Sequence, residues 1–338
     1  MHCTKLIVSV MLLATQAFAA EKAVLVAGGG TGDAKIVQPF AVDFGEDGSI
    51  YFVEMSGGER LRKIDAEGNI HTLAGTGKKG DSGDDGPADK ATFNGMHNLA
   101  VATDGTIYLA DTFNNRVRKY DPKTKTVSAF AGKKGEFSQA ICIALSRDNK
   151  TLYLADIGNR RVRAIDVKTG SVTTFAGNGI KGDPKDGEAA KDQPLQDPRA
   201  VAVDSKGQVY ILERGGHVLR VVDVNGKIRT VAGTGKSGKG GDGGPALKAA
   251  MNGPKFLFCD NDDSVLIADT ENHQVRRYVP GKELMELVAG SGMKGKGGVD
   301  GDPLKLELAR PHGVSRHPKT GELYIADSDN GRVIKIVK

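Results

Sequence analysis

The chain repeats one short pattern six times, and this repetition limits the folds that are open to it. Four strong copies, GTIYLADTFNNRVRKYD, KTLYLADIGNRRVRAID, DSVLIADTENHQVRRYV and GELYIADSDNGRVIKIV, start at Gly105, Lys150, Asp263 and Gly321. Two weaker copies, GSIYFVEMSGGERLRKID and GQVYILERGGHVLRVVD, start at Gly48 and Gly207. Such repetition predicts an array of equal units, each of which buries its faces against its neighbours.

Each copy contains four segments that are typical of strands. A segment such as NLAVAT meets a tight turn, and a segment such as TIYLAD follows with the aromatic and β-branched residues that strands favour. An Asp-x-x-Asn turn leads to a third segment, RVRKYD, and a fourth segment ends in Ala-Gly. No amphipathic stretch of helical length interrupts them. The pattern predicts an all-β fold, a β-propeller whose blades are four-stranded antiparallel sheets.

The phase of the repeats predicts how the ring closes. The sixth copy ends after its third strand, RVIKIVK, and AVLVAG at 23–28 resembles the fourth strands HTLAG, SAFAG, TTFAG, RTVAG and ELVAG. We expect residues 23–27 to pair with residues 332–338, so that the N-terminal strand joins the last blade. This pairing closes a six-bladed ring and covers a sheet edge. Truncation of either strand is expected to open the ring.

The N-terminus differs in kind from the repeats. Lys5 precedes an apolar run at 6–14, and Ala17-Phe18-Ala19 satisfies the A-x-A rule of signal peptidase. We predict a cleaved secretory signal peptide at 1–19, a propeller at 20–338, and a secreted or periplasmic location. The apolar run of about nine residues is far shorter than a membrane-spanning helix, so no membrane span is expected.

The charge content narrows the classes of possible binding partner. The formal net charge of +5 is small beside 47 basic and 42 acidic side chains, and a nucleic-acid partner is not expected because it needs basic residues gathered on one face.

Cys142 in AICIAL and Cys259 in KFLFCD fall in blades that do not touch. They are interpreted as buried free thiols rather than a disulfide.

Several motifs resemble a known repeat family. DTFNNRVRKYD, DTENHQVRRYV with its Asn272-His273 pair, and the inserts GDDGPADKATF and GDGGPALKAAM look like NHL-repeat propellers, here of a secreted bacterial type. The resemblance covers essentially the whole mature chain. It implies the fold but no single activity, because relatives of this shape include binding scaffolds, sensor domains, RNA binders and enzymes.

The Asp-x-x-Asn turns are interpreted as structural. A short carboxylate can accept hydrogen bonds from turn N–H groups, and asparagine suits left-handed backbone. The four pairs are Asp111 with Asn114, Asp156 with Asn159, Asp269 with Asn272, and Asp327 with Asn330. Glu54 and Glu213 replace the aspartate in two blades, so we do not expect one uniform role around the ring.

One face of such a propeller carries these turns and the long links between blades. Four links, 75–95, 177–197, 233–253 and 290–310, are rich in Gly and Asp, and variable loops on a rigid scaffold commonly bind ligands. Their aspartates are candidate calcium ligands, although solvated glycine turns are favoured because no known calcium-loop spacing is present. The candidates are Asp81, Asp84, Asp85, Asp186, Asp242, Asp300 and Asp302.

The second candidate site is the mouth of the central channel, where the inner strand of each blade begins. One residue from each blade is expected there: Phe40, His97, Ile141, Arg199, Lys255 and His312. Two histidines, an arginine and a lysine near one axis form a cationic pocket suited to an anionic ligand. The histidines would add a pH response below about 7.

This ring is similar to that of the amidating lyases, in which three histidines at comparable strand starts hold a catalytic zinc. His97 and His312 match two of them, whereas Arg199 takes the third place and has no lone pair for a metal. A two-histidine metal site, completed by water or a loop carboxylate, is the alternative. Zinc there and calcium in the loops are the possible cofactors. No carboxylate stands in the ring, and no G-x-S-x-G or H-E-x-x-H motif is present.

These observations favour an exported binding or scaffold module over an enzyme. Its partner is expected to be a protein, a peptide or a small anionic ligand, bound through the loop-rich face and the channel mouth. The alternative function is a metal-dependent lyase or hydrolase that works at the channel mouth.

Overall fold

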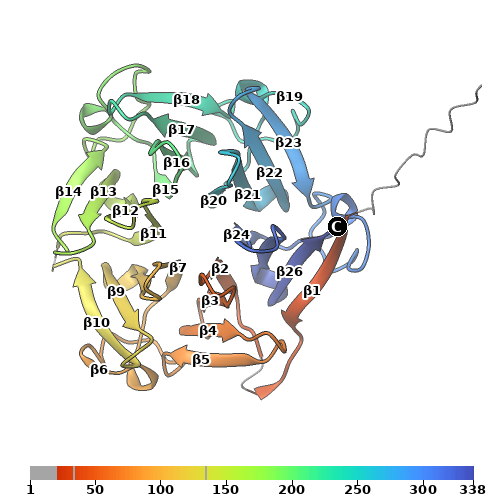
Figure 1. Cartoon of the computed structure of the whole chain (residues 1–338). Coiled ribbons are helices and arrows are strands. Elements are labelled where there is room, and N and C mark those ends of the chain that lie inside the picture. The colour runs from red at the N-terminus through yellow and green to blue at the C-terminus, as the bar shows by residue number, and fades with distance from the viewer. Residues whose placement is uncertain (1–20, 33–34, 134) are drawn as a thin grey trace, which may run out of the picture.

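The structure, a computed structural model, describes residues 21–32, 35–133 and 135–338. The signal peptide expected at 1–19 lies outside the described residues. Six antiparallel sheets stand around a central axis, each running from an inner strand to an outer strand at the rim (Figure 1). The predicted six-bladed, all-β propeller is confirmed.

The first three blades follow one another along the chain. The first contains β2 (Pro39–Phe44), β3 (Ile50–Glu54), β4 (Arg60–Ile64) and β5 (Ile70–Ala74). The second contains β7 (Met96–Val101), β8 (Ile107–Asp111), β9 (Arg116–Asp121) and β10 (Thr126–Ala131). The third contains β11 (Ala140–Leu145), β12 (Thr151–Asp156), β13 (Arg161–Asp166) and β14 (Val172–Ala176).

The remaining blades repeat this plan. The fourth contains β15 (Pro198–Val203), β16 (Val209–Glu213), β17 (Val218–Val222) and β18 (Ile228–Ala232). The fifth contains β20 (Phe256–Cys259), β21 (Val265–Asp269), β22 (Gln274–Val279) and β23 (Leu284–Ala289). The sixth contains β24 (Pro311–Arg316), β25 (Leu323–Asp327), β26 (Arg332–Val337) and β1 (Lys22–Gly28).

Short elements fill the loops. Two-residue strands from the long links, β6 (Gly86–Pro87) and β19 (Gly244–Pro245), add a fifth strand to two blades. The links also contain the 3-10 helices η2 (Ala88–Lys90), η5 (Ala190–Asp192), η6 (Ala246–Lys248) and η8 (Pro303–Lys305). Between second and third strands lie η3 (Thr112–Asn114), η4 (Ile157–Asn159), η7 (Thr270–Asn272) and η9 (Ser328–Asn330). No helix in the described part of the chain is long and apolar enough to cross a membrane.

The N-terminal strand closes the ring. β1 pairs antiparallel with β26, with Lys22 opposite Val337 and Ala23 opposite Ile336. Figure 1 shows the red N-terminal strand lying beside the blue C-terminal strand. The predicted closure is therefore confirmed, and the outer edge of β26 is covered by backbone hydrogen bonds.

Apolar side chains pack between neighbouring blades. The middle residue of each second strand is fully buried, and the six are Phe52, Leu109, Leu154, Ile211, Ile267 and Ile325. Because each blade buries both faces against its neighbours, no blade has a core of its own. Cys142 and Cys259 are buried free thiols, as predicted.

A buried carboxylate at the end of each second strand ties the blade to the link that leads into it. Glu54 accepts a hydrogen bond from the Val37 N–H at 2.7 Å. The other acceptor–donor pairs are Asp111 with Asn94, Asp156 with Ser138, Glu213 with Gln196, Asp269 with Asn252, and Asp327 with Ala309. The expectation of a non-uniform role was wrong for this position, because the longer glutamates reach the equivalent N–H.

The same carboxylates bind arginines of the third strand. Arg276 Nη1 lies 3.3 Å from Asp269 Oδ2, and Arg62 Nη1 lies 3.0 Å from Glu54 Oε2. The other pairs are Arg118 with Asp111, Arg163 with Asp156, Arg220 with Glu213, and Arg332 with Asp327. Burial raises the pKa of Asp111 and Asp269 to about 6, although these hydrogen bonds and arginines oppose the rise.

The turn asparagines behave differently from the expectation. Asn114 ends a 3-10 helix, and its Nδ2 donates to Asp111 Oδ2 at 2.9 Å and to the Gly80 carbonyl at 2.8 Å. The left-handed residue is the one that follows, such as Asn115 with φ 55°. The expectation was wrong because the asparagine amide is used as a donor to the carboxylate. Asn115 in turn accepts the Gln139 N–H of the next blade at 2.6 Å.

Candidate functional site

The six residues expected at the channel mouth lie where the inner strands begin. Five are the second residues of β2, β7, β11, β15 and β24, and Lys255 directly precedes β20. Each is buried, with between 5 and 8 % of its surface exposed. We call these six residues the channel mouth: Phe40, His97, Ile141, Arg199, Lys255 and His312.

Phe40 joins the two histidines of the channel mouth. Its ring stacks on the His312 imidazole, with centroids 4.0 Å apart and planes at 25°. It meets the His97 imidazole edge-on at 5.0 Å. Phe113, which is 44 % exposed, also contacts the His97 ring, at 5.5 Å. Blades one, two and six therefore bring two imidazoles against one apolar ring.

Both imidazoles are held through Nδ1. His97 Nδ1 lies 2.8 Å from the Gly95 carbonyl oxygen and 3.1 Å from Thr112 Oγ1. His312 Nδ1 lies 2.7 Å from the Arg310 carbonyl oxygen. A carbonyl oxygen only accepts hydrogen bonds, so each Nδ1 carries a proton. In the neutral ring each Nε2 then has a lone pair for a hydrogen-bond donor or a metal.

Burial and neighbouring cations keep the imidazoles neutral. Desolvation and, to a smaller extent, the charges of Arg199 and Lys255 together lower the pKa of His97 to about 3. Desolvation, Lys255 and Arg199 likewise hold the pKa of His312 well below its usual value. Protonation of these histidines below about pH 7 was therefore a wrong expectation, because both rings are buried and lie near Arg199 and Lys255.

Arg199 is a buried charge without a partner. Only 5 % of the residue is exposed, and within the described residues its guanidinium forms no hydrogen bond and no ion pair. The nearby carboxylate of Asp197 binds Arg214 instead, with Oδ2 3.1 Å from Nε. Burial lowers the pKa of Arg199 to about 10, so the side chain stays charged at neutral pH.

Lys255 adds further positive charge to the channel mouth. Its Nζ lies 2.7 Å from Glu271 Oε1, and the same carboxylate accepts hydrogen bonds from Arg310 Nε and Nη2. One carboxylate thus serves two cations. Together with Arg199, these groups leave the channel mouth positively charged.

The channel mouth fits a metal ion poorly. His97 and His312 offer two Nε2 atoms, but no group of three or more His, Cys, Asp or Glu in the described ranges is placed to hold a metal ion. The positive charges of Arg199 and Lys255 lie close enough to both imidazoles to oppose a dication there. The two-histidine metal site remains a prediction.

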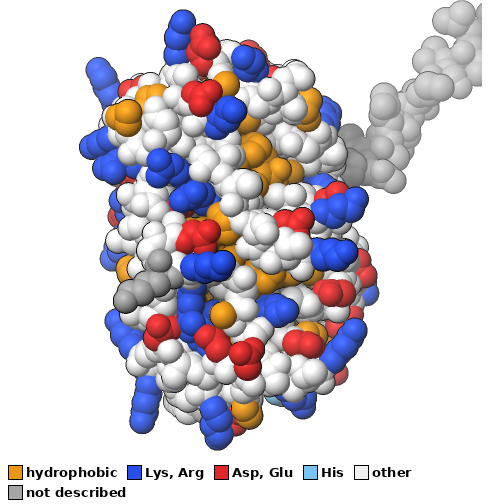
Figure 2. All heavy atoms as spheres, turned by 90° about the vertical axis from the view of Figure 1, so that its left-hand side faces the viewer, with side chains coloured by type: hydrophobic (Ala, Val, Ile, Leu, Met, Phe, Trp, Pro, Cys, Tyr) orange, Lys and Arg blue, Asp and Glu red, His pale blue; other side chains and the backbone are white. Residues whose placement is uncertain are grey.

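Several aspartates of the long links hold arginines. Asp84 accepts from Arg116 Nη1 at 2.6 Å and from Arg118 Nε at 2.8 Å. Asp242 accepts from Arg276 Nε at 2.8 Å. These contacts use the carboxylates to fasten the links to the third strands. On the side of the ring shown in Figure 2, acidic and basic side chains are interspersed.

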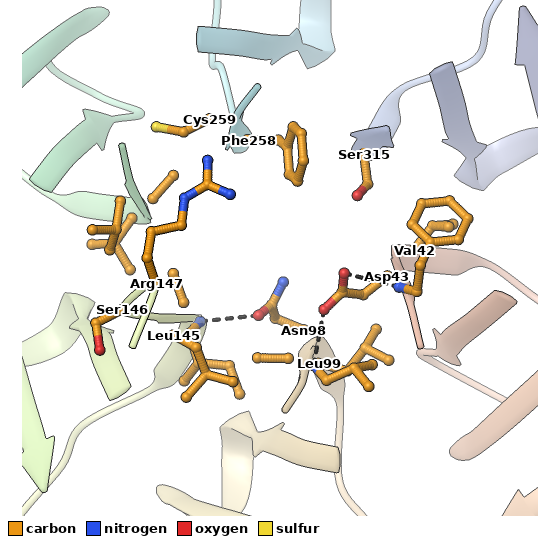
Figure 3. A pocket seen from close by; sticks show the side chains of 18 of the residues that line it. Val42, Asp43, Asn98, Leu99, Leu145, Ser146, Arg147, Phe258, Cys259 and Ser315 are labelled. Atoms are coloured by element: carbon orange, nitrogen blue, oxygen red, sulfur yellow. Dashed lines mark hydrogen bonds between the residues drawn. The ribbon is translucent and has the colours of Figure 1, made fainter. Parts of the chain in front are cut away.

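A cavity of about 410 Å³ lies at the other end of the inner strands (Figure 3). All six blades line it, through the second halves of the inner strands and the turns that follow several of them. We call it the far cavity. Its polar groups include the Asp43 carboxylate, the Asn98 amide, the Ser315 hydroxyl and the Arg147 guanidinium (Figure 3). None of these four residues was expected to belong to a site.

A regular signal could have located the far cavity. Counting three residues on from each residue of the channel mouth gives Asp43, Ala100, Ala144, Ala202, Phe258 and Ser315, all of which line it. The three alanines among these six residues leave space in the cavity, and Asp43 is the one charged residue of the six. Side chains recur on one face of a strand at every second residue, but five of the mouth residues are each the extra residue of a bulge, which shifts this register.

Comparisons with known proteins agree with the fold. A profile of the NHL repeat matches residues 308–336, which include β24, β25 and most of β26. The Arabidopsis thaliana chloroplastic protein SUPPRESSOR OF QUENCHING 1 is 29 % identical over 148 residues. The match covers 42 % of this chain but only 14 % of that protein, so the chain corresponds to a small part of this relative.

Solved structures resemble the whole ring. An auxiliary nutrient binding protein from Bacteroides ovatus has a TM-score of 0.70 and 16 % identity, covering 94 % of this chain and 76 % of that chain. Virginiamycin B lyase from Staphylococcus aureus has a TM-score of 0.58 and 11 % identity, covering 94 % and 99 %. Identities this low show the fold alone. The chain is thus a six-bladed β-propeller whose last blade matches the NHL repeat.

Proposed function

We propose that this chain is an exported propeller that binds a small anionic ligand, or the acidic end of a peptide, at the channel mouth. The observation that carries the proposal is Arg199, a guanidinium 5 % exposed that forms no hydrogen bond or ion pair within the described residues. A charge that has little access to water and no hydrogen-bonded partner is costly. A carboxylate or phosphate of the ligand would offset that cost through two parallel hydrogen bonds.

The neighbours of Arg199 support a ligand that also carries hydrogen-bond donors. Lys255 contributes positive charge, whereas the Nε2 atoms of His97 and His312 can only accept when the rings are neutral. Phe40 supplies an apolar surface between the two imidazoles. This combination suits a hydroxy acid, an amino acid or a peptide carboxyl end better than a simple inorganic anion.

Export and partner binding belong to the same proposal. The signal peptide predicted at 1–19 supports a secreted or periplasmic location. The shared fold with an auxiliary nutrient binding protein of Bacteroides ovatus supports a binding role. The loop-rich face, whose links are fastened by contacts such as Asp84 with Arg118, would present a rigid surface to a protein or peptide.

The alternative is a metal-dependent lyase or hydrolase at the channel mouth. The observation that favours it is the orientation of His97 and His312, because metal-binding histidines commonly donate their other N–H to a backbone carbonyl. Zinc would be held by the two Nε2 atoms and would act as a Lewis acid on a bound substrate. The positive charge of Arg199 and Lys255 counts against this alternative.

Titration calorimetry tests the proposal. Mature protein without a histidine tag would be titrated with lactate, succinate, glutamate and inorganic phosphate, beside Arg199→Met and Arg214→Met variants. Arg214 is the matched control, since it lies on the same face but is paired with Asp197. We expect Arg199→Met to weaken binding about tenfold or more and Arg214→Met to retain it. Equal binding by the wild type and Arg199→Met would contradict the proposal.

Metal analysis separates the two functions. Elemental mass spectrometry on the purified protein and on a His97→Ala, His312→Ala double variant would show whether these residues hold a metal. One equivalent of zinc, lost in the double variant, would favour the enzyme alternative. Calcium retained by both proteins would point to the long links instead.

A further inference from the structure

The far cavity contains a carboxylate that no side chain neutralises. Asp43 Oδ2 accepts from the Val101 N–H of the next blade at 2.9 Å, and Oδ1 accepts from the Phe44 N–H at 2.9 Å. In the described structure these two backbone groups are its hydrogen-bond partners. Each oxygen keeps a lone pair, and the side chain points into the cavity (Figure 3). Burial raises the pKa of Asp43 to about 6, so the carboxylate is mostly charged at neutral pH.

Two further polar groups face the same space. Ser315 is 2 % exposed, and its Oγ has no hydrogen-bond partner among the described residues. Asn98 accepts the Ile143 N–H through Oδ1 at 3.0 Å, and its other amide atom points into the cavity (Figure 3). A buried hydroxyl left without a partner is costly unless a ligand or water completes it.

The rest of the far cavity is suited to an apolar group. Ala144 and Ala202 leave room on one side, and the Phe258 ring borders the lumen (Figure 3). Arg147, an exposed residue of the turn after β11, extends over the opening towards Phe258 (Figure 3). The cavity thus combines an anionic group, an aromatic wall and a cation at its rim. Its volume of about 410 Å³ is within the range of small-molecule sites.

We propose that the far cavity is a second binding site, which takes a small zwitterion with an apolar or aromatic body. The ligand's protonated amine binds Asp43 and Ser315, its body lies against Phe258 and the alanines, and its carboxylate faces Arg147. An aromatic amino acid or a short peptide has this chemistry. The far cavity shares no residue with the channel mouth. The ligand group next to Asp43 is positively charged, whereas the group that Arg199 would bind is negatively charged.

Three related probes separate the parts of this ligand. L-phenylalanine carries both charges, 2-phenylethylamine lacks the carboxylate, and 3-phenylpropanoate lacks the amine. Isothermal calorimetry on Arg199→Met, in which the channel mouth lacks its anion-binding arginine, should show binding of L-phenylalanine, weaker binding of 2-phenylethylamine, and binding of 3-phenylpropanoate about tenfold weaker or more. Failure of both amines to bind would overturn the proposal, as would tightest binding of 3-phenylpropanoate.

Variants locate the binding in the far cavity. Asp43→Asn should weaken both amines about tenfold or more, whereas Arg147→Met should weaken L-phenylalanine alone. Asp223→Asn is the matched control, because Asp223 also accepts two backbone N–H groups but lies outside the cavity. Unchanged binding of the amines by Asp43→Asn would overturn the proposal.

A second variant keeps the test valid if Asp43→Asn unfolds. Ala144→Leu fills the cavity without changing any charge and, combined with Arg199→Met, should abolish binding of all three probes. Undiminished binding by a folded Ala144→Leu protein would place the amines elsewhere and overturn the proposal. 2-Phenylethylamine, which has no carboxylate for Arg199, should bind Arg199→Met as tightly as the wild type, so failure at the channel mouth and failure at the far cavity are distinguishable.

Discussion

Arg276 and Arg199 are both buried arginines, but the protein treats them in opposite ways. Arg276, inside the fifth blade, is fully buried and donates to Asp242, Asp269 and two backbone carbonyls. Arg199, at the channel mouth, is 5 % exposed and has no such partner in the described residues. Inside the blade the arginine has carboxylate and carbonyl partners from the protein itself. At the channel mouth the arginine is available to a bound ligand. This difference distinguishes a structural charge from a binding charge.

The largest change in stability is expected on replacing Arg276, the arginine with partners inside the blade. Arg276→Met would leave the buried carboxylate of Asp269 and the partly exposed carboxylate of Asp242 without this arginine, and should lower the free energy of unfolding by about 3–5 kcal/mol. Urea denaturation followed by circular dichroism measures this change. The adjacent Arg277→Met is the control, because its pair with Glu286 is about one-third exposed and contributes at most about 1 kcal/mol. If both variants lost the same free energy of unfolding, Arg276 could not be distinguished from a surface arginine in its contribution to stability.

A smaller effect is expected from the neutral imidazole of His97. Its pKa of about 3 in the folded protein lies below the ordinary value of 6.5, so protonation favours the unfolded chain. Stability from this group is therefore lost as the pH falls from about 6.5 towards 3, by at most about 1.4 kcal/mol per pH unit. His97→Gln should show a shallower loss of stability in this range.

Nuclear magnetic resonance measures the same property directly. The ring nitrogens of His97 should keep the shifts of a neutral, Nδ1-protonated imidazole between pH 8 and pH 4. In Arg199→Met its pKa should rise, because one of the two nearest cations is gone, but burial should keep it below the ordinary value. Titration of wild-type His97 near pH 6.5 would show that the channel mouth is wetter than the structure indicates.

The smallest effect on stability is expected at Arg199 itself. Replacement of an unpartnered buried charge by a methionine of similar length removes a desolvation cost, so Arg199→Met should unfold at the same free energy or at one higher by about 1 kcal/mol. A saturating anionic ligand should stabilise the wild type, by about 2.7 kcal/mol at a hundred times its Kd, and leave the variant unchanged. Marked destabilisation by Arg199→Met would instead assign Arg199 to the structural charges.

Most of the fold could be predicted because its information is local and repeated. The alternation in TIYLAD and the turn residues around it define strands within one blade, and six copies define the ring. The phase of AVLVAG against RVIKIVK was sufficient to predict the β1–β26 pairing. The turn geometry was predicted less well, because the Asn114 side chain could serve either the backbone or the neighbouring carboxylate.

The candidate sites could be predicted only in part. The positions at the channel mouth followed from counting within each blade, and the structure brings Phe40, His97 and His312 into contact there. The missing partner of Arg199 depends on which cations the nearby carboxylates bind. Asp197 binds Arg214 of its own blade, and Glu271 binds Lys255 and Arg310, which the sequence does not show. The far cavity depends on small residues in three blades and a carboxylate in a fourth, which no single repeat reveals.

Ring closure also has a consequence for the order in which this protein can fold. Blades one to five consist of hairpins between neighbouring segments, which can form soon after each segment is synthesised. The β1–β26 pair joins opposite ends of the chain, and contacts of such high sequence separation form slowly. Until it forms, β1 and the edge of β26 are open to strands of other molecules. Slow closure therefore makes the yield of folded protein depend on its concentration.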